Sequence, residues 1–196
     1  AECEVASITA PTATDNCGAT ITGITTDPLS YNTQGTHVIT WSFDDGNGNI
    51  TTETQNVIID DVTAPVADLA ALADVTAECE VASITAPTAT DNCGGTITAT
   101  TDATFPITAQ GTTVVTWTYD DGNGNTSTQT QNVVINDVTA PVADVATLVD
   151  VTAECEVASI TAPTATDNCG ATITGTTTDP LTCLLYTSPS PRDPWK

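Results

Sequence analysis

The feature that most constrains the fold of this chain is an internal repeat of 76 residues. The segment Ala1–Gly18 returns unchanged at Ala77 and again at Ala153. Trp41 and Trp117 keep the same register. A period this long exceeds that of a helical solenoid unit and fits one small domain per repeat. The sequence therefore predicts a tandem array of small domains.

The copies meet at a short acidic string that a proline ends, Asp60–Pro65. We expect a first repeat that lacks its first strand, then a complete repeat, a truncated repeat and a non-native tail. The corresponding ranges are 1–61, 62–137, 138–182 and 183–196. In the tail, residues 183–193 resemble one reading frame of a sequencing-library adapter, so the chain is expected to be a fragment and the tail is set aside.

The charge balance excludes several classes of function. The only basic residues, Arg192 and Lys196, lie in the tail, which also holds Asp193. Without the tail, the chain has 24 of its 25 acidic residues and no Lys or Arg. Nucleic acids and anionic membrane surfaces require such cations, and no apolar run is long enough to cross a bilayer. Catalysis is not expected either, because basic side chains are missing and His37 becomes Thr113 in the next copy. The protein is therefore predicted not to be an enzyme.

Cysteine usage indicates an oxidising, extracellular location. Outside the tail there are six cysteines, two per copy at a constant spacing of 14 residues. Small secreted domains often carry such pairs as disulfides, and a loop of that length would contribute roughly 3 kcal/mol. Free buried thiols are one alternative, and a metal site, which would need more Cys or His ligands, is another. The predicted disulfides are Cys3–Cys17, Cys79–Cys93 and Cys155–Cys169.

Alternating patterns predict strands throughout, and no helical periodicity is present. Thr36–Phe43 places Ile39, Trp41 and Phe43 on one face, and the next copy places Val115, Trp117 and Tyr119 there. Asp44–Asn49 contains Asn-Gly, a strong hairpin signal, and the return strand is predicted at Thr51–Ile59. Shorter strands are expected at Ser7–Thr9 and Thr20–Thr25. The predicted fold is all-β, with one immunoglobulin-like β-sandwich per repeat.

The complete copy resembles a hyalin-repeat (HYR) domain. The resemblance is carried by an ordered series of motifs: Ala86–Asn92, Phe105-Pro106, Gln110–Trp117, Tyr119-Asp120, Gly124-Asn125 and Val133–Asp137. It implies an immunoglobulin-like fold in extracellular proteins linked to adhesion. The cysteine spacing is also similar to that of tandem arrays in very large surface proteins of gliding bacteria. The family's usual late cysteine is missing from both copies, which leaves the early pair to close a local loop.

Calcium is the one candidate cofactor, because hard cations need several oxygen ligands close together. Two groups of acidic and amide side chains could supply them. One group flanks the linkers, whose string Asn136–Pro141 is similar to cadherin linkers: Asp60, Asp61, Asp68, Asn136, Asp137 and Asp144. The other lies in the hairpins and has the spacing that begins an EF-hand loop: Asp45, Asn47, Asn49, Asp121, Asn123 and Asn125. Turn chemistry alone also explains the hairpin residues, and Asp15-Asn16 could either join a site or cap a turn.

Two functions are consistent with these features. The first is a structural spacer or stalk of a cell-surface adhesin, in which neighbouring repeats contact one another and calcium stiffens the rod. The alternative is direct binding of a glycan or a surface protein. Near-identity of the copies favours the spacer, since ligand-specific faces usually lie on variable loops. Binding would be sought where the copies differ, at Thr25–Gln34 and Thr101–Gln110.

Overall fold

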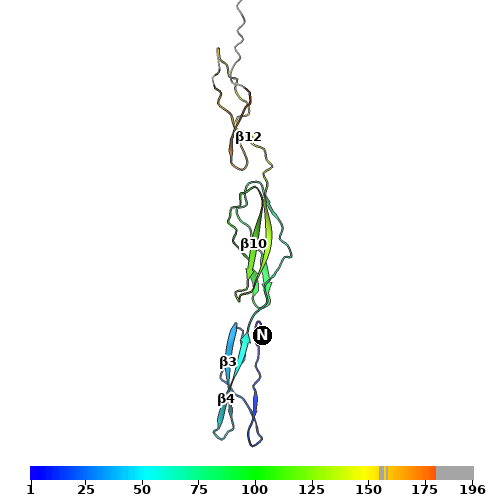
Figure 1. Cartoon of the computed structure of the whole chain (residues 1–196), viewed down its shortest axis with the longest axis vertical. Coiled ribbons are helices and arrows are strands. Elements are labelled where there is room, and N and C mark those ends of the chain that lie inside the picture. Colours follow the sequence, from blue (N-terminus) through cyan, green and yellow to red (C-terminus); the bar gives the residue numbers. More distant parts are fainter. Residues whose placement is uncertain (155–156, 158, 180–196) are drawn as a thin grey trace, which may run out of the picture.

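The computed structural model describes residues 1–154, 157 and 159–179. The adapter-like segment 183–193 and Cys155 lie outside these residues. The described chain contains strands and no helix, and its repeats follow one another along a single long axis (Figure 1). No helix in the described part of the chain could therefore span a membrane.

The first repeat contains two antiparallel pairs of strands. These are β1 (Thr12–Thr14) with β2 (Thr20–Thr22), and β3 (Gly35–Asp44) with β4 (Ile50–Ile59). A single bridge between Ile24 and Ser42 connects the two pairs. The amide of Asp60 donates to the carbonyl of Ala1 at 2.9 Å, so the start of the chain lies beside the end of β4.

The second repeat contains two sheets. The first has the order β5–β7–β8 and consists of β5 (Val66–Ala67), β7 (Thr88–Asp91) and β8 (Gly95–Thr98). The second has the order β6–β11–β10–β9 and consists of β6 (Val75–Ala77), β11 (Thr126–Ile135), β10 (Gly111–Asp120) and β9 (Thr100–Thr101). Only the β6–β11 pairing is parallel.

The described part of the third repeat forms one sheet of order β12–β13–β14. Its strands are β12 (Val142–Ala143), β13 (Thr164–Thr166) and β14 (Thr172–Thr174). Their antiparallel pairings repeat those of β5, β7 and β8.

Alternating faces of the long strands form the cores, as the sequence predicts. Ile39, Trp41 and Phe43 of β3 are buried, and so are their counterparts in β10: Val115, Trp117 and Tyr119. In the second repeat, Ala89 of the three-stranded sheet packs into the same cluster as these β10 residues. The core thus lies between two sheets, which is the arrangement of a β-sandwich.

The predicted hairpins are confirmed, whereas one of the short strands is misplaced. β3 and β4 pair over their full length and end at the turn Asp45–Asn49, where Gly46 and Gly48 adopt φ of 79° and 95° that disfavour other residues. The strand expected at Ser7–Thr9 lies instead at Thr12–Thr14, across from Thr20–Thr22. The proline at position 11 separates the two segments, and the pairing with β2 decides which of them becomes a strand.

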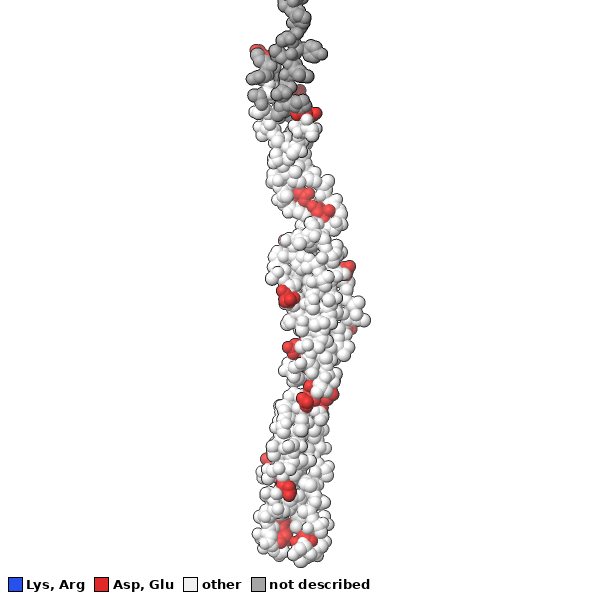
Figure 2. Space-filling model, in the orientation of Figure 1, with Lys and Arg blue, Asp and Glu red and all other residues white. Residues whose placement is uncertain are grey.

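The surface is acidic along its length. Figure 2 shows carboxylate side chains at intervals from one end of this face to the other, with no Lys or Arg among the described residues on it. Acidic side chains from the linker and from the following repeat come together where one repeat meets the next, and the candidate site lies there.

Candidate functional site

Two disulfides join successive repeats. Cys3 bonds to Cys93 and Cys79 bonds to Cys169, with Cα atoms 4.9 and 5.0 Å apart and a sequence separation of 90 residues in each case. Since the repeat is 76 residues, a separation of 90 pairs the first cysteine of one copy with the second cysteine of the next. Each bond therefore crosses a joint between repeats.

This pairing corrects the local disulfides expected from the sequence. Cys3 does not bond to Cys17, nor Cys79 to Cys93; Cys17 is an exposed free thiol. The third predicted pair, Cys155–Cys169, is also wrong, because Cys169 bonds to Cys79 and Cys155 lies outside the described residues. The physical reason is that the segment around Cys3 reaches the turn after β7, where Cys93 is presented. A constant spacing in a tandem repeat is equally compatible with pairing within a copy and pairing between copies.

A glutamate beside each bridging cysteine ties the two repeats together with hydrogen bonds. The Oε2 atom of Glu2 accepts from Asn92 Nδ2 at 2.6 Å and from Thr63 Oγ1 at 2.9 Å, and the Glu2 carbonyl accepts from Gln34 Nε2 at 2.9 Å. The next joint repeats this arrangement around Glu78, with Thr139, Asn168 and Gln110 as donors. The two joints therefore share these contacts around the glutamate.

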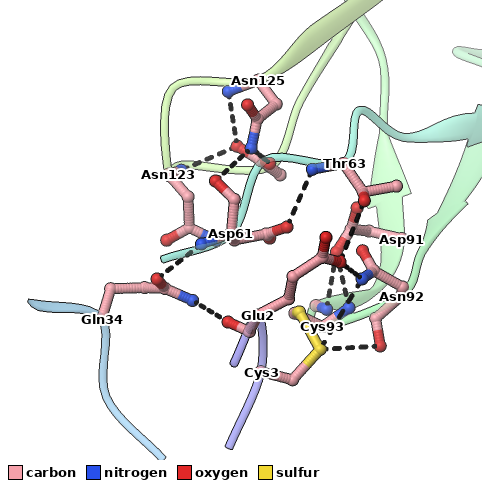
Figure 3. Close-up of a disulfide and its surroundings, with 12 residues drawn as sticks. Glu2, Cys3, Gln34, Asp61, Thr63, Asp91, Asn92, Cys93, Asn123 and Asn125 are labelled. Atoms are coloured by element: carbon pink, nitrogen blue, oxygen red, sulfur yellow. Dashed lines mark hydrogen bonds between the residues drawn. A yellow bond between two sulfur atoms is a disulfide. The ribbon is translucent and has the colours of Figure 1, made fainter. Parts of the chain in front are cut away.

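Asp61 lies at the centre of the first joint (Figure 3). Its amide donates to Gln34 Oε1 at 2.9 Å, and its Oδ1 accepts from the amide of Thr63 at 3.2 Å. The hairpin of the second repeat covers it: Asn123 Nδ2 donates to Asp61 Oδ2 at 3.1 Å and Asn125 Nδ2 to its carbonyl at 3.0 Å. Asp61 is consequently only 5% exposed. Its counterpart Asp137 has no such hairpin over it in the described part of the chain and is exposed.

Asp91 faces the same joint and is 6% exposed. Its Oδ2 accepts from the amides of Cys93 and Gly94 at 2.7 and 3.1 Å, while its Oδ1 is buried without a hydrogen-bond partner within the described residues. One carboxylate oxygen of Asp61, one of Asp91 and the Sγ of Cys93 lie within 4.8 Å of one another. Because this sulfur is in a disulfide, it is not a thiolate ligand. Asp137, Asp167 and Cys169 form the same cluster at the next joint.

The residues predicted to hold calcium are distributed differently from the two groups expected. Asp61 from the linker group and Asn123 and Asn125 from the hairpin group come together at one joint. Asp121, which belongs to the same turn, accepts from the amides of Asn123 and Asn125. Asp91, which lies at the same joint, is not among the residues that the sequence predicts for this site, although its counterpart Asp15 belongs to the same Asp-Asn-Cys-Gly motif.

The other predicted ligands do not join this cluster. Asp68 accepts from the hydroxyls of Thr88 and Thr90, and Asp144 accepts in the same way from Thr164 and Thr166. These hydrogen bonds lower the pKa of both carboxyl groups below its usual value. The backbone amide of Asp60 donates to the carbonyl of Ala1, and that of Asn136 donates to the carbonyl of Ala77 at the end of β6.

In the first hairpin, the hydrogen bonds of the Asp45 carboxylate all come from residues of its own turn. Asp45 Oδ1 accepts from the amides of Asn47 and Asn49 at 2.8 and 3.1 Å, and its Oδ2 accepts from Asn49 Nδ2 at 2.7 Å. These bonds, that from the Asn49 side chain first, lower the pKa of the Asp45 carboxyl. Turn chemistry alone therefore accounts for Asp45, Asn47 and Asn49, as the alternative interpretation has it.

Comparisons with known proteins agree on one family. Residues 2–59 and 63–135 match the model of the HYR-like domain with 4 cysteines. The chain is 39% identical over 191 residues to hyalin of Strongylocentrotus purpuratus, covering 88% of this chain and 16% of that protein. It is 37% identical over 186 residues to hyalin of Lytechinus variegatus, covering 84% of this chain and 34% of that protein. The chain thus spans much less than half the length of either relative, and the bacterial source expected from the resemblance stays a prediction.

Proposed function

Because the chain belongs to the family of HYR-like domains with 4 cysteines, we propose that its repeats form an extracellular structural spacer in an adhesion-type protein. The observation that carries the proposal is that both described disulfides, Cys3–Cys93 and Cys79–Cys169, link one repeat to the next. Domains joined by a single linker ordinarily move relative to one another. A second covalent connection across each joint restricts that motion and favours a rod.

Further features support this role. Disulfides persist in oxidising compartments such as the cell exterior. The two sheets of the complete repeat support an immunoglobulin-like sandwich, the module that the family resemblance implies. The role is non-enzymatic: the described residues hold one histidine, His37, and no Lys or Arg. We extend the proposal to calcium as a stiffening cofactor, for which the acidic joints are the support.

Small-angle X-ray scattering of the oxidised chain tests the spacer. We expect a rod whose conformational spread widens when Cys3→Ser removes the bond across the first joint. Cys17→Ser is the matched control, because Cys17 has the same repeat position as Cys93 but forms no disulfide. Its scattering is expected to match that of the unmodified chain. Equal flexibility in all three proteins would contradict the spacer.

Direct binding of a glycan or protein ligand is the second candidate. The observation that favours it is the difference between Thr25–Gln34 and Thr101–Gln110 in otherwise near-identical copies. Exchange of one segment for the other, followed by binding to a glycan array and to cells, distinguishes the two functions. A spacer predicts no change in either assay.

A further inference from the structure

Two buried carboxylates, those of Asp61 and Asp91, lie close together at the first joint. Asp61 is 5% exposed and Asp91 is 6% exposed, and an oxygen of each lies within 4.8 Å of the other. The described residues contain no Lys or Arg that could neutralise them. Like charges held this close and out of water repel each other strongly, and buried charges are normally paired or bound to metal.

One oxygen in this pair has no partner. The Oδ2 atom of Asp91 is used by two backbone amides, whereas Oδ1 is buried and accepts no hydrogen bond within the described residues. An ionised carboxylate oxygen in that condition lacks the compensation that buried polar atoms almost always have. It is an available ligand atom in a place where one is needed.

From these observations we propose that the Asp61–Asp91 pair is a calcium site that bridges the first two repeats. Asp61 and Asp91 supply carboxylate oxygens. The Asn123 side chain lies against Asp61, and the oxygen and nitrogen of such an amide exchange places by a simple flip. Figure 3 shows the Glu2 side chain entering the same space from the first repeat. The ligands therefore come from both repeats and the linker between them.

The chemistry of these atoms selects the cation. All the available donors are hard oxygens, which suit calcium, and calcium completes its six to eight ligands with water. Zinc is disfavoured, because the only nearby sulfur is in a disulfide and no histidine lies at the joint. The site rests on the proposed spacer function and deepens it, since a cation here would hold the two repeats together beside the Cys3–Cys93 bond.

The second joint provides an internal comparison. Asp137 and Asp167 form the same pair, but Asp137 is exposed and no hairpin covers it in the described part of the chain. Asp167 is buried like Asp91, but water reaches Asp137, screens the repulsion between the two carboxylates and lowers the affinity of this pair for calcium. We therefore expect one tight and one weak site in this chain.

Isothermal titration of calcium into the whole oxidised chain tests the site. Asp91→Asn keeps the shape and removes the charge, and we expect the tight site to weaken by about tenfold or more, since calcium affinity follows the number of charged ligands. Asp15→Asn is the matched control, because Asp15 has the same motif position in the first repeat but is only partly buried and faces no linker aspartate within the described residues. It is expected to bind calcium as the unmodified chain does. Unchanged affinity in Asp91→Asn overturns the proposal.

Thermal unfolding provides a readout that does not depend on measured affinity. With chelator, Asp91→Asn is expected to melt at least as high as the unmodified chain, because it relieves the repulsion. With calcium, and not with magnesium, the order should reverse. A lower midpoint for Asp91→Asn in both conditions would show that Asp91 only supports its own turn and would overturn the site. X-ray scattering separates the two proposals: a calcium-insensitive rod retains the spacer without the site, whereas a flexible chain that binds calcium tightly retains the site without the spacer.

Discussion

Asp68 is an exposed carboxylate that connects the short strand β5 to β7 through hydrogen bonds. It follows β5 directly and accepts hydrogen bonds from Thr88 and Thr90, of which the first is at the start of β7. The hydroxyl bonds, that from Thr88 first, favour the ionised form and lower the pKa of this carboxyl from 3.8. A two-residue strand depends on such side-chain contacts, because its ladder contributes few backbone bonds.

The lowered pKa of Asp68 gives a pH dependence of known sign. A carboxyl whose pKa is lower in the folded state adds stability at a pH above 3.8, and this contribution is lost as the pH falls through the folded pKa. We expect Asp68→Asn to lower the melting temperature at pH 7 and to have little effect at pH 2. Asp60→Asn is the control, because the Asp60 carboxylate accepts no hydrogen bond within the described residues. If Asp68→Asn lowers the melting temperature equally at both pH values, the charge of this carboxylate does not contribute to stability.

At the scale of elements, the two hairpins have the same turn but different surroundings. In the first, Asn49 bonds only to Asp45 of its own turn. In the second, Asn125 makes the equivalent bonds to Asp121 and also donates to the carbonyl of Asp61 in the linker. The β10–β11 hairpin is thus both a turn and a part of the joint.

Comparing the two asparagines isolates the contribution of the joint. In chelator, Asn125→Ala is expected to lower the free energy of unfolding by about 1–3 kcal/mol more than Asn49→Ala, because it leaves a buried carbonyl unpaired. Urea denaturation of the two variants measures the difference. If both variants lose the same stability, the bond to Asp61 contributes nothing beyond the turn.

The sequence predicts the hairpins because their signals are local. The alternation of apolar and polar residues in β3 and β10, and the Asn-Gly turn that follows each strand, are visible within about ten residues of sequence. The buried faces of both strands agree with the prediction. The joint cannot be read in this way. Asp61 and Asn123 are 62 residues apart, and the disulfide partners are separated by 90. Nothing in a regular repeat tells pairing within a copy from pairing between copies; only the packing of one repeat on the next decides it.

At the scale of the whole molecule, the acidic surface has no internal counter-charge. Outside residues 192 and 196 the sequence contains no Lys or Arg, and carboxylates are distributed along the visible face (Figure 2). Self-repulsion of this kind destabilises the compact state, and dissolved salt screens it. We expect the melting temperature to rise steadily with sodium chloride from 10 mM to 500 mM, as followed by circular dichroism with chelator present. A decrease with salt would indicate that attractive charge interactions dominate, contrary to this description.

The staggered disulfides also determine how the molecule responds to tension. A pull along the array passes from Cys3 to Cys93, back along the backbone to Cys79, and through the next bond to Cys169. Only the stretch between Cys79 and Cys93 bears the load in series, and it extends to about 50 Å at most, against about 270 Å for a whole repeat of 76 residues. The disulfides bypass the remainder of each repeat, which therefore bears no tension. Even with every sandwich unfolded, such a tether lengthens little, so its reach is set by covalent connectivity and not by the strength of its folds.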